Sequence, residues 1–110
     1  MDQAVAAYIA NIPGPFRPMF DRISALIFEV CPGAELVLTY AMPTYRTGRR
    51  LFVAVWAHGV SLYGWRHEGG FSLRHPELIS GKATIRLTTG AAAAIPDEEF
   101  RDLIRGVLVG

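Results

Sequence analysis

Residues 51–65 read LFVAVWAHGVSLYGW, and the fold prediction starts from them. They form two runs of β-forming residues, 51–57 and 60–65, on either side of His58-Gly59. A glycine in a two-residue loop supplies the positive φ that a tight hairpin turn needs. The stretch therefore predicts two antiparallel strands joined by a tight turn.

A turn at His58-Gly59 also assigns each side chain to one face of the sheet. It would pair Val55 with Leu62, and successive side chains of a strand alternate between the faces. One face is then aliphatic. We call the other the second face, and it would carry Phe52, Ala54, Trp56, Ser61, Tyr63 and Trp65.

A similar turn at Thr47-Gly48 would pair Tyr45 with Arg50 and add both side chains to the second face. Each aromatic side chain can bury roughly 150–250 Å². Five of them exceed the apolar patch of a few hundred Å² that a monomer usually exposes. We therefore expect the second face to be covered by another part of the chain such as residues 66–82, by a second subunit or by a ligand.

The rest of the chain has helical periodicity near both ends and further β-rich runs in the middle. Asp2 is a candidate N-cap, and apolar residues follow at helical spacing. A helix over about 15–31 has the apolar stripe Phe16, Met19, Phe20, Ile23, Leu26, Ile27 and Val30. The other expected elements are helices over 2–11 and 96–108, strands over 36–40, 44–46 and 83–87, a helical turn over 77–80 and a connector over 90–94.

This order of elements is typical of an α+β fold. Strands joined by tight turns form antiparallel sheets, and helices at both chain ends can cover one face of such a sheet. We predict a two-layer sandwich with the helices packed on a mainly antiparallel sheet of about five strands. No linker divides the chain, so residues 1–110 are expected to form one domain.

Composition excludes several classes of protein. The chain has 110 residues, of which 51% are hydrophobic and 19% are charged, so it is not intrinsically disordered. No apolar run approaches the ~18–20 residues of a membrane span. The first residues lack a basic signal-peptide region, and Cys31, the single cysteine, cannot form an internal disulfide. We therefore expect a cytoplasmic protein with no membrane partner.

The net charge of +1 conceals an uneven distribution. Residues 1–45 have a net charge of −2, residues 46–86 of +5 and residues 87–110 of −2. The basic charge therefore coincides with the aromatic strands. An aromatic, arginine-bearing sheet face can stack single-stranded bases, but the chain lacks the Gly-Phe-Gly-Phe type of motif that accompanies this function. The sequence does not favour a nucleic-acid partner.

Motifs of catalysis, phosphate binding and metal binding are incomplete. Gly81-Lys82-Ala83-Thr84 lacks the spacing of a P-loop, although Lys82 is the chain's only lysine beside ten arginines. The three histidines do not have the spacing of metal ligands, and there is no Gly-x-Ser-x-Gly motif. We therefore predict neither a catalytic residue nor a bound cofactor, although a Tyr, His and Lys in one cleft would be able to exchange protons.

Several segments, taken in order, resemble the YdhG-like family, also catalogued as domain of unknown function 1801. The resemblance covers nearly the whole chain and implies an α+β fold similar in layout to frataxin. It also implies an alternative function, that of an intracellular iron-binding chaperone. The matching segments are Val5–Ile9 with Pro13, Cys31-Pro32 with Ala34-Glu35, Tyr40–Tyr45, His58 with Ser61-Leu62-Tyr63, Gly81–Arg86, and Ile95-Pro96.

Iron would be the cofactor only under this alternative. Hard cations prefer carboxylate oxygens, whereas the first two helices contain only three acidic residues and the predicted strands are basic. The remaining acidic cluster lies at the start of the last helix, where the helix dipole explains it equally well. This cluster consists of Asp97, Glu98, Glu99 and Asp102.

The residues themselves favour a non-enzymatic binding domain. Its ligand would be a small, anionic and partly aromatic molecule or a protein partner, held on the aromatic and basic sheet face. A third possibility is that the aromatic face joins two copies of the chain, so the protein is expected to be a monomer or a homodimer. The candidate binding residues are Tyr40, Met42, Tyr45, Trp56, His58, Tyr63, Lys82 and Arg86.

Overall fold

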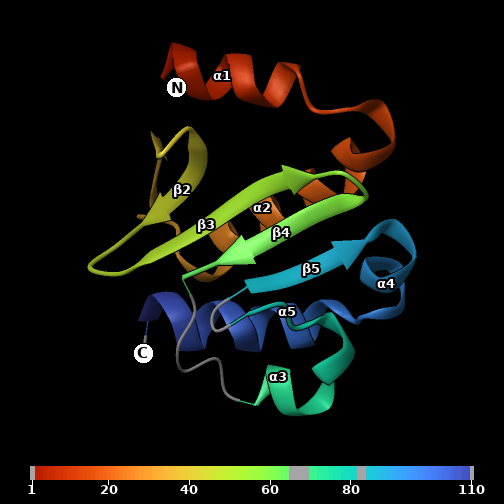
Figure 1. Ribbon diagram of the computed structural model, residues 1–110. Helices are drawn as coiled ribbons and strands as arrows, with labels where there is room; N and C mark the ends of the chain where they lie inside the picture. Colours follow the sequence, from red (N-terminus) through yellow and green to blue (C-terminus); the bar gives the residue numbers. More distant parts are fainter. Residues whose placement is uncertain (1, 65–69, 82–83, 110) are drawn as a thin grey trace.

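The computed structural model of the chain describes residues 2–64, 70–81 and 84–109, and it confirms the predicted α+β two-layer fold. Five antiparallel strands follow one another across the sheet in chain order (Figure 1). In the view of Figure 1, helix α2 lies behind this sheet and helix α5 runs below β5. The strands are β1 (Glu35–Thr39), β2 (Met42–Arg46), β3 (Arg50–Trp56), β4 (Gly59–Tyr63) and β5 (Thr84–Thr88).

Helices α1, α2 and α5 match the helices predicted near the ends of the chain, and the structure adds two that were not predicted, α3 and α4. Asp2 caps the first helix, because its Oδ1 accepts a hydrogen bond from the N–H of Ala4 at 2.7 Å. No helix among the described residues is both long and apolar enough to cross a membrane. The helices are α1 (Gln3–Ala10), α2 (Arg17–Val30), α3 (Phe71–Arg74), α4 (Thr89–Ala94) and α5 (Asp97–Ile104), with 3₁₀ turns over Gly14–Phe16 and Pro76–Leu78 and a π-helical turn over Arg105–Val109.

Helix α4 shows that the connector predicted over residues 90–94 is wrong. Its alanines favour a helix, and the hydroxyl of Thr88 caps it by accepting a hydrogen bond from the N–H of Ala91 at 3.1 Å. The following turn is held by Arg22 of α2, which donates to the carbonyl oxygens of Ala92 at 2.7 Å and Ile95 at 2.6 Å. The helical layer is therefore joined by polar contacts as well as by apolar packing.

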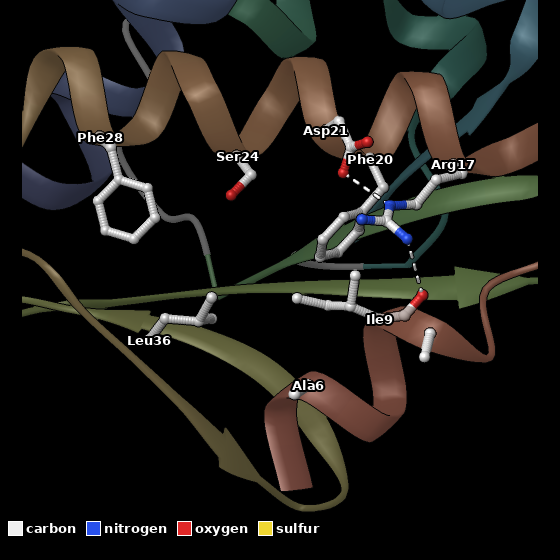
Figure 2. A pocket seen from close by; sticks show the side chains of 9 residues that line it. Ala6, Ile9, Arg17, Phe20, Asp21, Ser24, Phe28 and Leu36 are labelled. Atoms are coloured by element: carbon white, nitrogen blue, oxygen red, sulfur yellow. Dashed lines mark hydrogen bonds and ion pairs between the residues drawn. The ribbon is translucent and has the colours of Figure 1, made fainter. Parts of the chain in front are cut away.

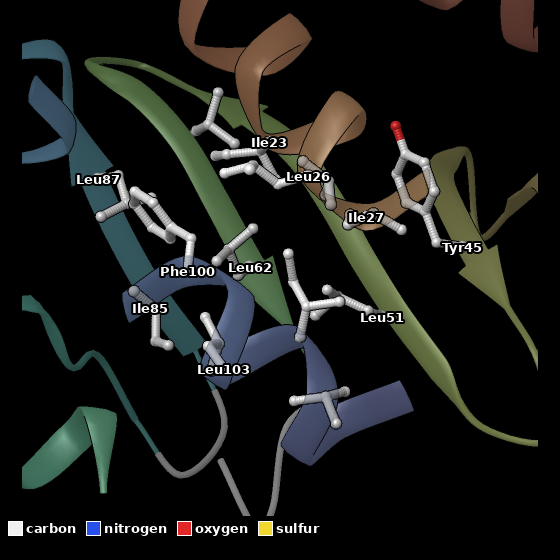
Figure 3. Packing of buried hydrophobic residues seen from close by; sticks show 14 of the residues in the cluster. Ile23, Leu26, Ile27, Tyr45, Leu51, Leu62, Ile85, Leu87, Phe100 and Leu103 are labelled. Carbon is white, nitrogen blue, oxygen red and sulfur yellow. The ribbon is translucent and has the colours of Figure 1, made fainter. Parts of the chain in front are cut away.

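The hydrophobic core fills the space between the helices and one face of the sheet (Figure 3). The predicted stripe of α2 is buried over Met19, Phe20, Ile23, Leu26 and Ile27. Burying each such side chain contributes roughly 1.5–3 kcal/mol, so this face holds the two layers together. The stripe packs with Phe100, Leu103 and Ile104 of α5 and with Leu51, Val53, Val60, Leu62, Ile85 and Leu87 of the sheet.

The turn between β3 and β4 is shifted from the prediction, but the predicted faces are correct. Val55 pairs with Val60 rather than Leu62, and Trp56 pairs with Gly59, so residues 57 and 58 form the turn. The partner of each β3 residue thus changes by two positions. Because the side-chain period of a strand is two, this even shift leaves every side chain on its predicted face.

The turn between β2 and β3 is different, and here the predicted pairing is wrong. Tyr45 pairs with Leu51 rather than with Arg50, because the loop has three residues, 47–49. The N–H of Thr47 donates to the carbonyl of Arg49 at 2.8 Å, and the Thr47 hydroxyl accepts from the N–H of Arg49 at 3.2 Å. A shift by one position moves Tyr45 to the core face, where its side chain is fully buried.

The β1–β2 hairpin turns at Tyr40 and Ala41, which both have positive φ, 53° and 61°. Two-residue turns of this geometry favour Asn and Gly, and the left-handed conformation costs other residues roughly 1–2 kcal/mol each.

The β2–β3 ladder ends at Thr44, because the preceding Pro43 has no N–H to donate. Beyond this point, the N–H of Val55 donates to the hydroxyl of Tyr8 at 2.9 Å, which ties α1 to the sheet.

Relieving the strained left-handed conformation of Ala41 should stabilise the protein. We expect Ala41→Gly to raise the free energy of unfolding by about 1 kcal/mol, because glycine adopts positive φ without the clash of a Cβ atom. The matched control is Ala57→Gly in the other hairpin turn, where φ is not positive and added chain entropy should lower stability. Urea unfolding measures both, and an Ala41→Gly protein less stable than the wild type would contradict the prediction.

Candidate functional site

The second face of the sheet carries aromatic and basic side chains, as the sequence predicts for most of them. In Figure 1 no described helix lies across the side of the sheet that is turned toward the viewer. Phe52 of β3 lies opposite Tyr63 of β4. Arg50 lies two residues before Phe52 and Trp56 lies four residues after it, so all three side chains are on the same face of β3. Among the residues that the structure describes, three half-buried aromatic side chains lie on this face: Phe52, Trp56 and Tyr63.

Trp56 forms the centre of a stacked cluster at one end of the face. The guanidinium carbon of Arg86 lies 5.0 Å from the centroid of the Trp56 ring, and the ring of His58 meets it edge-on at 5.2 Å. Arg86 is exposed, and the structure shows no ion pair for it in the described part of the chain. The cluster therefore presents a cation that is held against an aromatic ring while its N–H groups remain open to solvent.

Gly59 permits the position of the Trp56 ring. Trp56 belongs to β3, yet its indole N–H donates to the carbonyl oxygen of Leu87 in β5 at 3.3 Å, so the side chain reaches across β4. The β4 residue opposite Trp56 is Gly59, which has no side chain to obstruct the ring. A Cβ atom at this glycine would lie 1.9 Å from the carbonyl oxygen of Leu87. No other residue type therefore fits at position 59 unless the backbone shifts.

Ser61 has a buried hydroxyl on this same face, and no described residue forms a hydrogen bond with it. It is fully buried between Ala54 of β3 and Arg86 of β5, its two cross-strand partners. By contrast, the buried hydroxyl of Thr44 donates to the carbonyl of Met42 at 3.0 Å. An unsatisfied buried hydroxyl costs about 1–3 kcal/mol. The second face therefore holds an available polar group in the position next to Arg86.

Two further arginines lie directly opposite each other on the second face. Arg46 of β2 pairs with Arg50 of β3, and like charges in opposite positions of a sheet repel. Arg46 contacts Glu35 at 3.3 Å, whereas Arg50 is exposed and shows no ion pair among the described residues. This end of the face therefore has an excess of positive charge that an anion would relieve.

The remaining predicted site residues are not all on this face. Tyr40 lies at the hairpin tip, 81% exposed, with its ring 6.4 Å from that of Phe52, and Met42 is half-buried at the start of β2. Tyr45 lies on the core face instead. Lys82 and Trp65 lie outside the described residues. Phe52 is an addition to the predicted list, and its predicted place on the second face beside Trp56 was the signal that could have included it.

The acidic cluster of α5 is paired with arginines. Within residues 2–64, 70–81 and 84–109, no group of three or more His, Cys, Asp or Glu side chains is arranged to hold a metal ion. Arg105 and Arg101 hold the pKa of Glu98 below its usual range, and His75 and Arg74 do so for Glu99. The ion pairs are Arg22–Asp97, Arg101–Glu98, Arg105–Glu98, Arg74–Glu99, His75–Glu99 and Arg105–Asp102.

Comparisons of the chain with protein-family models, with curated proteins and with solved structures found no match. The resemblance to the YdhG-like family and to the frataxin layout therefore stays a prediction. Only the geometry of the site supports a function for this chain.

A side chain at position 59 should disrupt the β4–β5 pairing. We expect Gly59→Ala to lower the free energy of unfolding by several kcal/mol, because the added Cβ collides with a backbone oxygen that cannot rotate away. The matched control is Gly90→Ala in α4, where nothing lies within 4 Å, and it should stabilise the protein by about 0.5–1 kcal/mol. Thermal unfolding followed by circular dichroism tests both, and equal effects would contradict the steric argument.

Glu99 should make stability depend on pH in the acid range. Its pKa is lowered in the folded protein, so its carboxylate stabilises the fold above the ordinary glutamate pKa of 4.5, and this contribution is lost as pH falls through the lower folded value. We expect Glu99→Gln to be less stable than the wild type at pH 7, with the difference shrinking toward pH 3. Chemical unfolding of both proteins at several pH values measures this difference in the free energy of unfolding. A difference that stays constant over this range would refute the assignment.

Proposed function

We propose that the protein is a small-molecule binding domain whose second face takes a ligand with a planar aromatic body and an anionic group. The exposed Arg86 stacked on Trp56 is the observation that carries this proposal. A guanidinium held in place by a ring loses less freedom when it binds a carboxylate or phosphate, because its planar fork is already oriented. The aromatic residues of the same face provide surface against which a planar ligand can stack.

Two further features of the face favour an anion. Arg46 and Arg50 oppose each other, so bound negative charge near them reduces their repulsion. The hydroxyl of Ser61, which has no hydrogen-bond partner among the described residues, lies directly across from Arg86 and can donate to a ligand oxygen that reaches it. The proposal is for binding and not for catalysis, because these groups recognise charge and shape and show no pairing of a nucleophile with a base.

The test uses naphthoate, an aromatic carboxylate, and naphthamide, its neutral counterpart of the same shape. We expect naphthoate to shift the NMR signals of the Trp56 indole N–H and of β3–β5 amides, with naphthamide binding at least tenfold more weakly. Arg86→Gln should remove this preference for the anion while the fold is retained, since Arg86 is exposed. Arg105→Gln is the matched control, because Arg105 is an exposed arginine of the helical layer.

Three results would overturn the proposal. The first is the absence of shifts at millimolar naphthoate, and the second is equal binding of naphthoate and naphthamide. The third is a dimer in sedimentation equilibrium whose concentration-dependent shifts map to the second face, which would assign this face to a homodimer instead.

A further inference from the structure

A groove lies on the helical side of the molecule, between α1, α2 and the edge strand β1 (Figure 2). Its volume is about 390 Å³, within the range of about 300–1,000 Å³ that is usual for small-molecule sites. The walls are apolar for most of their length: Ala6 and Ile9 come from α1, Phe20 and Phe28 from α2, and Leu36 from β1. Phe28 is 36% exposed, so part of this apolar lining is in contact with solvent.

One hydroxyl group interrupts the apolar lining. Figure 2 shows the side chain of Ser24 directed from α2 into the groove. Its Oγ accepts a hydrogen bond from the hydroxyl of the buried Tyr45 at 2.7 Å. Burial raises the pKa of Tyr45 to about 12, so this phenol stays protonated at neutral pH. With Tyr45 as the donor in this bond, Ser24 keeps its own hydrogen to donate to a molecule in the groove.

The charged groups at the groove neutralise each other. Arg17 and Asp21, one helical turn apart on α2, form an ion pair at 2.8 Å, and Arg17 also donates to the carbonyl oxygen of Ile9 at 3.4 Å. An ion would have to compete with this pair for either partner. A neutral molecule meets no such competition, so charge complementarity selects a ligand without net charge.

We propose that this groove is a second binding site, which takes a neutral, apolar small molecule whose carbonyl oxygen accepts a hydrogen bond from Ser24. The apolar walls supply the area for binding, and the single donor sets the orientation of the ligand. The site is independent of the second face: it lies on the other side of the sheet and selects against the charge that the second face attracts.

The test uses prodan, a neutral naphthalene ketone whose fluorescence responds to apolar surroundings and to hydrogen bonding at its carbonyl. We expect the wild-type protein to bind prodan and Ala6→Phe to weaken binding at least tenfold by filling the groove. Ala7→Phe is the matched control, because Ala7 is exposed on the same helix but does not line the groove.

A second variant tests the role of the hydroxyl. Replacing Ser24 alone would leave the Tyr45 hydroxyl without its acceptor, so Ser24→Ala is combined with Tyr45→Phe. We expect a three- to tenfold loss of prodan affinity, as for one neutral hydrogen bond, and a blue shift of the bound probe. Absence of prodan binding, or equal losses in Ala6→Phe and Ala7→Phe, would overturn the site. Unchanged affinity and emission in the double variant would overturn the carbonyl recognition.

Discussion

The pairing of Tyr45 with Leu51 is the contact on which the arrangement of both sides of the sheet depends. It turns the Tyr45 side chain beneath α2, where its hydroxyl reaches Ser24. Burying a tyrosine in this way contributes apolar area, and the hydrogen bond avoids the penalty of an unpaired buried hydroxyl. The same pairing leaves the second face to Phe52 and its neighbours. One register thus determines the composition of the core face and of the face opposite.

The two sides of the sheet differ in how their charges are compensated. In the helical layer, Arg22, Arg101 and Arg105 are paired with the carboxylates of α5 and Glu29. On the second face, the exposed Arg50 and Arg86 show no carboxylate partner among the described residues. The net charge of +1 is therefore a cancellation between the acidic segments 1–45 and 87–110, at −2 each, and the basic segment 46–86, at +5. This separation is the physical basis for assigning an anionic ligand to one side and a neutral ligand to the other.

Much of the fold could be predicted because periodicity is a local property. The apolar stripe of α2 and the alternation in β3 and β4 assign side chains to faces even when a turn is misplaced by an even number of residues. The prediction for Tyr45 is wrong because the length of the β2–β3 loop depends on the Thr47 hydroxyl, which closes a three-residue loop where a two-residue turn was expected. Of the candidate site, the sequence correctly placed Trp56, Tyr63 and Arg86 on the second face, and it did not anticipate the groove beside Ser24.

The residue pattern alone was sufficient for the order of the five strands and of helices α1, α2 and α5, for the α+β class and for the aromatic character of the second face. Each of these follows from the spacing of apolar residues over a few turns or a single strand. The contact of Arg86 with Trp56 and the pairing of the α5 carboxylates required the folded chain. The groove between α1 and α2 also required the folded chain. These features join residues that are distant in sequence, and their formation depends on packing energies that no local pattern contains.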